Sequence, residues 1–185
     1  QVVLLKNNGI LPIRGNAKKI AVLGAISEEN FRDWYTGYFR NAVSAVEGIR
    51  NEFAESEILS DDLWDIVAIK NSEGKYLSIH EDGTIFADSN TPDENCLFKL
   101  KKWGDNCWNL FSETHGKYAA YKDGTLKLSE NFIYDWYTSE SFNFRNIGGN
   151  EYIIEDFLLH RRMEWEKNGR LSLEKNTPVL PKNTF

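Results

Sequence analysis

HEDGTIFADSN, residues 80–90, returns in altered form as YKDGTLKLSEN at 121–131 and as EKNGRLSLEKN at 166–176, at spacings of 41 and 45 residues. Each copy contains an Asp-Gly or Asn-Gly pair, followed by residues that alternate between apolar and polar. Such a pair favours the positive φ angles of tight hairpin turns, and the alternation is typical of a half-buried strand. The three copies therefore predict three repeats, each built around a tight β-hairpin.

Each repeat extends on both sides of its hairpin. The strand before the turn is predicted at 74–79, 116–121 and 160–165, and a first strand at 66–71, 108–113 and 153–158. A phenylalanine follows each of these glycines by 15 to 20 residues, and we expect it to be an apolar core residue on the fourth strand of its repeat. These residues are Phe98, Phe142 or Phe144, and Phe185. Four short strands in each of three repeats predict about twelve strands.

Four short strands cannot bury an apolar face alone, so the repeats must close on one another. Three units around a pseudo-threefold axis form a six-stranded barrel with one end capped by the remaining hairpins, which is a β-trefoil. A propeller has a similar period but normally needs four or more blades. The sequence thus predicts a mainly β fold, with a β-trefoil over 64–185 preceded by a partial α/β segment over 1–60.

Residues 1–60 do not share the repeat. KKIAVLGAIS at 18–27 is typical of a buried strand that ends in a small-residue turn. AVSAVEGIRNEFAES at 42–56 has apolar side chains three or four residues apart, which predicts an amphipathic helix. Since neither phosphate-loop pattern accompanies the glycine of AVLGAIS, we interpret this stretch as a strand-to-helix turn and not as a nucleotide site.

GKYLSIHEDGTIFADS followed by FKLKKW resembles the fascin-like branch of the β-trefoil superfamily, and the resemblance covers residues 64–185. The Gln-x-Trp signature of ricin-type sugar-binding trefoils is absent. Fascin bundles actin with several trefoils, whereas this is a single acidic trefoil without a basic patch. Actin or protein interaction is therefore the least favoured alternative.

VVLLKNNGILPI, KKIAVLG and DWYTGYFRNAVSAVEGIR, in this order, resemble the entry to the C-terminal α/β sandwich domain of family 3 glycoside hydrolases. These enzymes are β-glucosidases, β-xylosidases and related exo-acting hydrolases. The resemblance implies a parent enzyme that hydrolyses terminal β-linked sugars, with an oligo- or disaccharide substrate. It also implies a trefoil inserted into the α/β domain near Ser60–Trp64, with the remainder of the hydrolase polypeptide as its partner.

No catalytic residue is predicted within this chain. A retaining glycosidase needs two carboxyl groups about 5 Å apart, and the resembled family places its nucleophile in a separate barrel domain and its acid/base beyond the segment present here. The fragment alone should be inactive. No cofactor or metal is expected, because the three histidines are scattered and lack zinc-site spacing. Cys96 and Cys107 are expected to be buried free thiols.

Exposed aromatic side chains are the candidates for carbohydrate contact. They are Trp103, Trp108, Trp136 and Tyr137 in the trefoil. Asp33, Trp34 and Tyr35 in the DWYTGYF stretch are further candidates, because the family resemblance implies a loop that runs near the sugar-binding cleft, and packing of that loop is the alternative. The alternative is that these aromatic rings pack inside and that the trefoil is a structural spacer. An independent carbohydrate-binding trefoil is a further alternative.

Composition narrows the classes of partner. The net charge of −6 argues against nucleic acid, and no apolar run reaches the roughly 18–20 residues that span a bilayer. The first residues lack the pattern of a signal peptide and an initiator Met, so we expect a piece of a longer protein. A cytoplasmic and a secreted parent are both compatible with this sequence.

Overall fold

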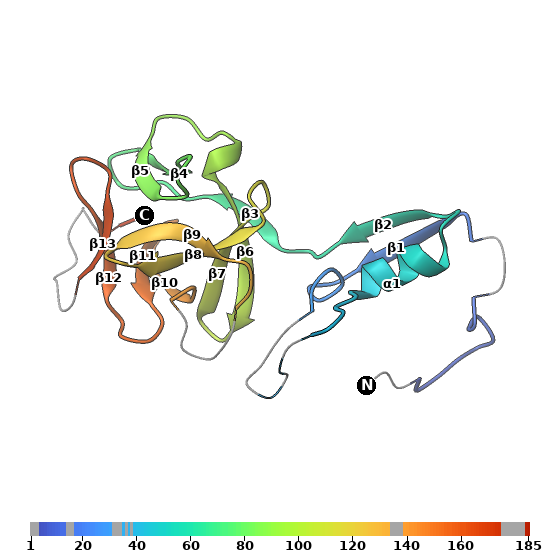
Figure 1. The fold of residues 1–185 in the computed structure, drawn as a ribbon. Coiled ribbons are helices and arrows are strands. Elements are labelled where there is room, and N and C mark those ends of the chain that lie inside the picture. The colour runs from blue at the N-terminus through green and yellow to red at the C-terminus, as the bar shows by residue number, and fades with distance from the viewer. Residues whose placement is uncertain are drawn as a thin grey trace. The chain divides into compact units, whose positions relative to one another are not determined.

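The structure is a computed structural model that describes residues 4–13, 17–30, 35, 37, 39–133, 139–174 and 184–185 (Figure 1). These residues form two compact units. The first comprises the residues up to Leu63, and the second comprises Trp64–Phe185 together with residues 35 and 37. No helix among the described residues is long and apolar enough to cross a membrane.

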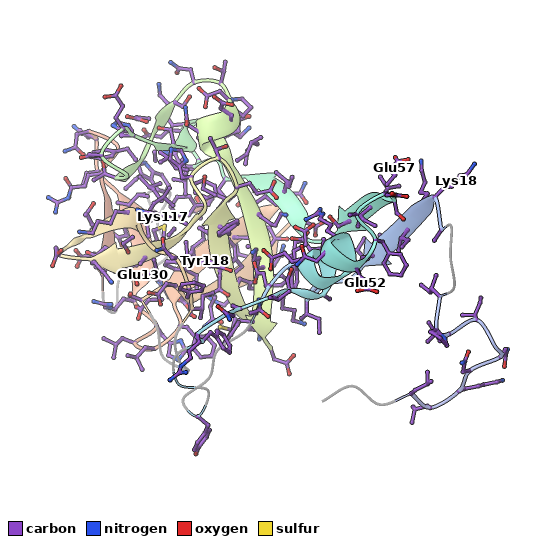
Figure 2. All side chains as sticks on the ribbon, turned by 45° about the vertical axis from the view of Figure 1, so that its right-hand side comes forward. Lys18, Glu52, Glu57, Lys117, Tyr118 and Glu130 are labelled. Carbon is purple, nitrogen blue, oxygen red and sulfur yellow. The ribbon has the colours of Figure 1, made fainter. Side chains whose placement is uncertain are left out.

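The first unit is one parallel strand pair with a helix between its strands. β1 (Lys19–Leu23) pairs with β2 (Glu57–Asp61), and α1 (Ala45–Glu52) belongs to the connection that a parallel pair requires. The N–H of Glu57 donates to the carbonyl of Lys18 at 2.9 Å, at the end of the pair that Figure 2 labels. The predicted strand and helix are both present, and the helix begins three residues later than expected. The prediction that the strand is buried is wrong, because β1 has only one neighbouring strand and its residues alternate between half-buried and exposed.

The helix begins at Ala45 because Ser44 and Glu47 form a capping box. The Glu47 N–H donates to Ser44 Oγ at 3.2 Å, and the Ser44 N–H donates to Glu47 Oε2 at 2.8 Å. These bonds satisfy two N–H groups that a helix start leaves without partners. Val46 is only 1% exposed, so one face of this short helix is anchored within the first unit.

The second unit is all β and follows the predicted repeats. Its strands are β3 (Asp65–Ala68), β4 (Tyr76–Ile79), β5 (Ile85–Ser89), β6 (Leu97–Gly104), β7 (Cys107–Ser112), β8 (Lys117–Lys122), β9 (Thr125–Glu130), β10 (Phe142–Gly148), β11 (Glu151–Asp156), β12 (Arg162–Trp165) and β13 (Leu171–Glu174). A 3₁₀ turn, η1 (Glu94–Cys96), precedes β6. Each repeat's first strand begins one or two residues earlier than expected. The third repeat's fourth position is occupied by Thr184 and Phe185.

Five strands form the barrel, in the order β3, β6, β7, β10, β11, and each is antiparallel to its neighbours (Figure 1). Val67 lies opposite Phe98, Trp108 lies opposite Phe142, and Tyr152 exchanges two backbone hydrogen bonds with Phe185, at 2.8 and 3.0 Å. These three pairs are equivalent, one in each repeat. The mainly β trefoil that the sequence predicted is therefore the fold of this unit.

Hairpins β4–β5, β8–β9 and β12–β13 contact one another across the repeats. The N–H of Leu128 donates to the carbonyl of Gly83 at 2.8 Å, and the N–H of Ala87 donates to the carbonyl of Gly169 at 2.7 Å. Each glycine has a positive φ, of 81° and 83°. Such a φ, combined with this close approach of backbone, explains why glycine stands at these turns.

The prediction of a tight turn in each hairpin is wrong for two of the three hairpins. The second hairpin is a two-residue turn, with Asp123 at φ 52° and Gly124 at φ 76°. In the first hairpin Asp82 stays at negative φ and accepts the N–H of Thr84, at 2.9 Å, and Asn168 accepts the N–H of Arg170 in the third, also at 2.9 Å. A side chain that accepts an N–H two residues further on stabilises a longer loop.

The core lies within the trefoil. Phe98 and Phe142 are fully buried and Phe185 is 9% exposed, so all three predicted plug residues are core residues. Cys96 and Cys107 are buried free thiols, as expected, and burial raises the pKa of both.

Candidate functional site

A hollow of about 970 Å³ opens in the wall of the trefoil barrel between β3 and β11. One wall is formed by Asp65 and residues 67–72, the other by residues 150–152 and Ile154, and Thr184 and Phe185 also line the hollow. Leu100 and Phe144, on β6 and β10, form its apolar floor. The turns β6–β7 and β10–β11 contribute Asn106 and Asn150. All of these residues belong to the second unit.

Asn71 is the most buried polar side chain that lines the hollow, at 2% exposure. Its Oδ1 accepts the N–H groups of Glu73 and Lys75, at 3.1 and 2.9 Å, which fixes the side-chain orientation. Its Nδ2 is buried and has no hydrogen-bond partner in the described part of the chain. A buried donor without a partner costs folding free energy.

The structure brings one of the predicted carbohydrate-contact residues to the hollow. Trp108 is half-buried on β7, lines the hollow, and has Lys102 Nζ at 5.9 Å from its ring centroid. Trp103 is half-buried near the end of β6 and does not line the hollow. Tyr35 is 96% exposed. Four of the predicted contact residues lie outside the described residues: Asp33, Trp34, Trp136 and Tyr137.

Asn71 and Tyr152 are among the residues of the hollow that sequence reasoning missed. Tyr152 adjoins the predicted strand at 153–158 and occupies the position of Trp108 in its own repeat. Aligning the repeats on their barrel strands would have found this aromatic residue. The role of Asn71 depends on a side-chain hydrogen bond that no motif encodes.

A second polar cluster lies within the trefoil. Lys101 is only 6% exposed, and its Nζ donates to the Tyr118 hydroxyl at 3.2 Å and lies 3.9 Å from the ring centroid of Phe111. Figure 2 shows Tyr118 on β8 beside Lys117. An ammonium over an aromatic face is held by the ring quadrupole. This cluster joins three adjacent strands, β6, β7 and β8, and supplies no group to the hollow.

The pKa of Asp82 is shifted in the direction that disfavours a catalytic acid. The Thr84 hydroxyl, and then the Thr84 N–H, hold the pKa of Asp82 below its usual value. A general acid in glycoside hydrolysis needs a raised pKa. Asp82 also stands in an exposed hairpin turn, where its hydrogen bonds to Thr84 account for its presence.

The three histidines have separate local partners. His80 Nε2 lies 2.9 Å from Asp88 Oδ2, His115 Nδ1 lies 3.0 Å from Ser112 Oγ, and His160 Nδ1 lies 3.5 Å from Asn143 Nδ2. Within the described ranges, no three His, Cys, Asp or Glu side chains are grouped so that they could hold a metal ion.

The fold defines a mainly β protein in which a trefoil follows a small strand–helix unit. The family of the glycosyl hydrolase family 3 C-terminal domain matches residues 2–164. The chain therefore belongs to this family and is part of a glycoside hydrolase. The match extends across most of the trefoil as well as the first unit, so it does not itself mark a boundary between them.

Among solved structures, the chain is similar to one titled "Crystal structure of designed 3-fold symmetric protein, ThreeFoil". The TM-score is 0.50 and the sequence identity is 13%, over 65% of this chain and 94% of that chain. At this identity the likeness concerns the fold alone, and it agrees with the threefold arrangement of the repeats. No curated protein matches this chain.

Proposed function

We propose that this chain is a non-catalytic part of a β-glycosidase that hydrolyses terminal β-linked sugars, of the β-glucosidase or β-xylosidase type. The observation that carries the proposal is the family match over residues 2–164. The parallel pair β1–β2 with its connecting helix supports an α/β origin for the first unit.

The trefoil is proposed to be a fascin-like module inserted into the α/β domain near Ser60–Trp64, so that residues 1–60 and 64–185 have different origins. β2 ends at Asp61, and the two compact units divide after Leu63, which supports an insertion at this point. Insertions in such connections are tolerated because the entropy of loop closure grows slowly with length.

Within the parent, a structural role for the trefoil is favoured. Trp165 is a core residue at 6% exposure, and Trp103 and Trp108 are half-buried, so none of these three is fully exposed to a ligand. Aromatic rings that pack in this way stabilise the barrel. The trefoil then shapes or spaces the parent enzyme, and a role as an actin-binding module is not favoured.

Carbohydrate contact is the second candidate, and the hollow is the observation that favours it. Trp108, Phe144 and Tyr152 provide apolar rings, and Asn71 provides a buried amide donor. A concave site that combines aromatic rings with a few fixed polar groups is typical of small-molecule binding. If this candidate is correct, the trefoil would contact the saccharide substrate of the parent or act as a binding module by itself.

Two measurements test these proposals. The chain alone is expected not to cleave 4-nitrophenyl β-glucoside or β-xyloside, and cleavage would refute the non-catalytic assignment. Calorimetric titration with β-linked gluco- and xylo-oligosaccharides separates the two roles, because only the second candidate predicts heat of binding. In that case Trp108→Phe should weaken binding, whereas Phe132→Leu, which alters an exposed aromatic residue that does not line the hollow, should leave it unchanged.

The family assignment of the parent has its own test. The coding sequence on both sides of this chain is expected to encode a barrel with a Ser-Asp-Trp motif upstream and further strand–helix units downstream. Flanking sequence of another kind would contradict the proposed parent, whatever the titrations show.

A further inference from the structure

Two asparagine–glycine peptides occur in this chain, Asn8-Gly9 and Asn168-Gly169. Such a peptide is chemically reactive, because glycine has no Cβ to obstruct the approach of its nitrogen to the preceding side-chain amide. The glycine nitrogen bonds to the asparagine Cγ, the Cγ–Nδ2 bond breaks, and ammonia leaves. Water then opens the resulting cyclic imide, so the product is aspartate or isoaspartate and carries an added negative charge.

The third hairpin of the trefoil protects Asn168. The N–H of Gly169 donates to the carbonyl of Glu166 at 2.8 Å, and the carbonyl of Gly169 accepts the N–H of Ala87 at 2.7 Å. The side chain is held too, since Asn168 Oδ1 accepts the N–H of Arg170 at 2.9 Å. A Cβ on Gly169 would lie only 3.1 Å from the carbonyl oxygen of Ala87, so this backbone is closely packed. Attack on the Asn168 Cγ therefore requires the hairpin to open.

Asn8 lies in an exposed turn that gives no such protection. Asn7 closes this turn, because its Oδ1 accepts the N–H groups of Gly9 and Leu11, each at 3.1 Å, and its Nδ2 donates to the carbonyl of Leu11 at 2.6 Å. These bonds are all exposed to solvent, and so is Asn8 itself. No hydrogen bond joins the Asn8 amide to another described residue. A Cβ on Gly9 would meet nothing within 4 Å, so the Gly9 nitrogen has room to approach the Asn8 Cγ.

We propose that Asn8 is a site of spontaneous deamidation, and that the fold confines the reaction to Asn8 by protecting Asn168. In the isoaspartate product the main chain gains one carbon atom before Gly9. The bonds from Gly9 and Leu11 to Asn7 Oδ1 depend on the length of the chain between these residues, so the turn opens in this product. The inference goes beyond the proposed function, because it concerns the chemistry of this chain's own amides and holds whichever sugar the parent hydrolyses.

Asn7 is adjacent to the proposed site and provides an internal comparison. Its side-chain amide makes three hydrogen bonds, and the residue that follows it, Asn8, carries a Cβ. Reaction at Asn7 would therefore need the turn to open and a more crowded nitrogen to attack. We expect the product to form at position 8 and not at position 7.

The test incubates the whole folded chain at mildly alkaline pH, which favours loss of the glycine amide proton, and follows deamidation by peptide mass spectrometry. Trypsin releases residues 7–14, and a glutamate-specific protease releases residues 167–174. We expect deamidation at Asn8 to be at least about tenfold faster than at Asn168, because only Asn168 must wait for a hairpin to open. Equal rates at the two sites, or product at Asn7 in place of Asn8, would overturn the proposal.

Two controls separate the fold from the local sequence. In guanidinium chloride the two rates should agree within about threefold, since neither site then has a folded environment. A difference that persisted in the denaturant would overturn the protective role of the hairpin. Gly9→Ala places a Cβ beside the attacking nitrogen and should slow the reaction at Asn8 at least about tenfold, and an unchanged rate would overturn the imide route. The aryl-glycoside assay and the flanking sequence test the family role independently.

Discussion

The N–H of Leu173 lies 3.3 Å from the hydroxyl of Tyr121, whereas the corresponding N–H groups of Leu128 and Ala87 donate to glycine carbonyls. In this third contact the carbonyl of Gly124 accepts instead from Arg170 Nη2, at 2.9 Å. The second hairpin has the tight two-residue turn, which places its glycine differently from those of the other repeats. Two side chains therefore replace one backbone bond where the threefold symmetry is broken.

Replacing Tyr121 with phenylalanine tests this replacement. Tyr121→Phe removes the acceptor of the Leu173 N–H, and the free energy of unfolding should fall by about 1–2 kcal/mol. Urea denaturation measures the loss. Tyr76→Phe is the control, since Tyr76 is a half-buried strand tyrosine on β4, and its change should stay within about 0.5 kcal/mol. Equal effects of the two variants would show that the Tyr121 hydroxyl does not stabilise the contact between the hairpins β8–β9 and β12–β13.

Gly169 tests how closely the hairpins approach. A Cβ at this position would lie 3.1 Å from the carbonyl oxygen of Ala87, in addition to the strain of φ 83°. We expect Gly169→Ala to lower the free energy of unfolding by about 2–4 kcal/mol.

Gly116 provides the matched control for this change. It also has a positive φ, of 63°, but an added Cβ would meet nothing within 4 Å. Gly116→Ala should therefore cost only the left-handed backbone penalty, about 1–2 kcal/mol. If the two variants were equally stable, the close contact between Gly169 and Ala87 would not contribute to the loss of stability in Gly169→Ala.

The lowered pKa of Asp82 predicts that the stability of the folded protein depends on pH. Its pKa in the folded protein is lowered, first by the Thr84 hydroxyl, so the charged form is favoured by folding. The resulting stability is present above the unfolded-state pKa and is lost as the pH falls through the folded-state pKa. Between about pH 5 and pH 2 the thermal midpoint of Asp82→Asn should therefore fall less steeply than that of the parent chain.

Asn168 shows that an amide suits such a turn, because it accepts the N–H of Arg170 in the third repeat. Asp82→Asn is therefore expected to fold. Asp105→Asn serves as the control, since Asp105 is a fully exposed carboxyl whose Lys102 partner lies 3.9 Å away. An acid slope altered as much by Asp105→Asn as by Asp82→Asn would argue that general surface charge is the cause.

The capping box formed by Ser44 and Glu47 stabilises the start of helix α1 in the first unit. Ser44→Ala removes the acceptor of the Glu47 N–H and should destabilise α1 by about 1 kcal/mol, because that N–H loses its partner. Exchange of the helix amides should accelerate about fivefold. Glu52→Gln, at the last residue of α1, which Figure 2 labels, should cause no such acceleration. No difference between the two variants would mean that tertiary contacts alone hold the helix.

Much of the architecture could be read from local patterns. The Asp-Gly and Asn-Gly pairs placed three hairpins, and the spacing of Phe98, Phe142 and Phe185 found core residues whose burial the structure confirms. The candidate site was less accessible to this reasoning. Of the three predicted contact residues that the structure describes, only Trp108 lines the hollow, because partial burial depends on neighbours from distant strands, such as Lys102.

The sequence by itself determined the repeat, its threefold count and the strand–helix character of the first unit, because turn chemistry and apolar periodicity act over a few neighbouring residues. Only the tertiary structure decided which turns are tight, how Tyr121 replaces a backbone acceptor, and where Asn71 keeps a buried donor without a partner. Each of these depends on groups far apart in sequence, which meet only when the three repeats close around one core.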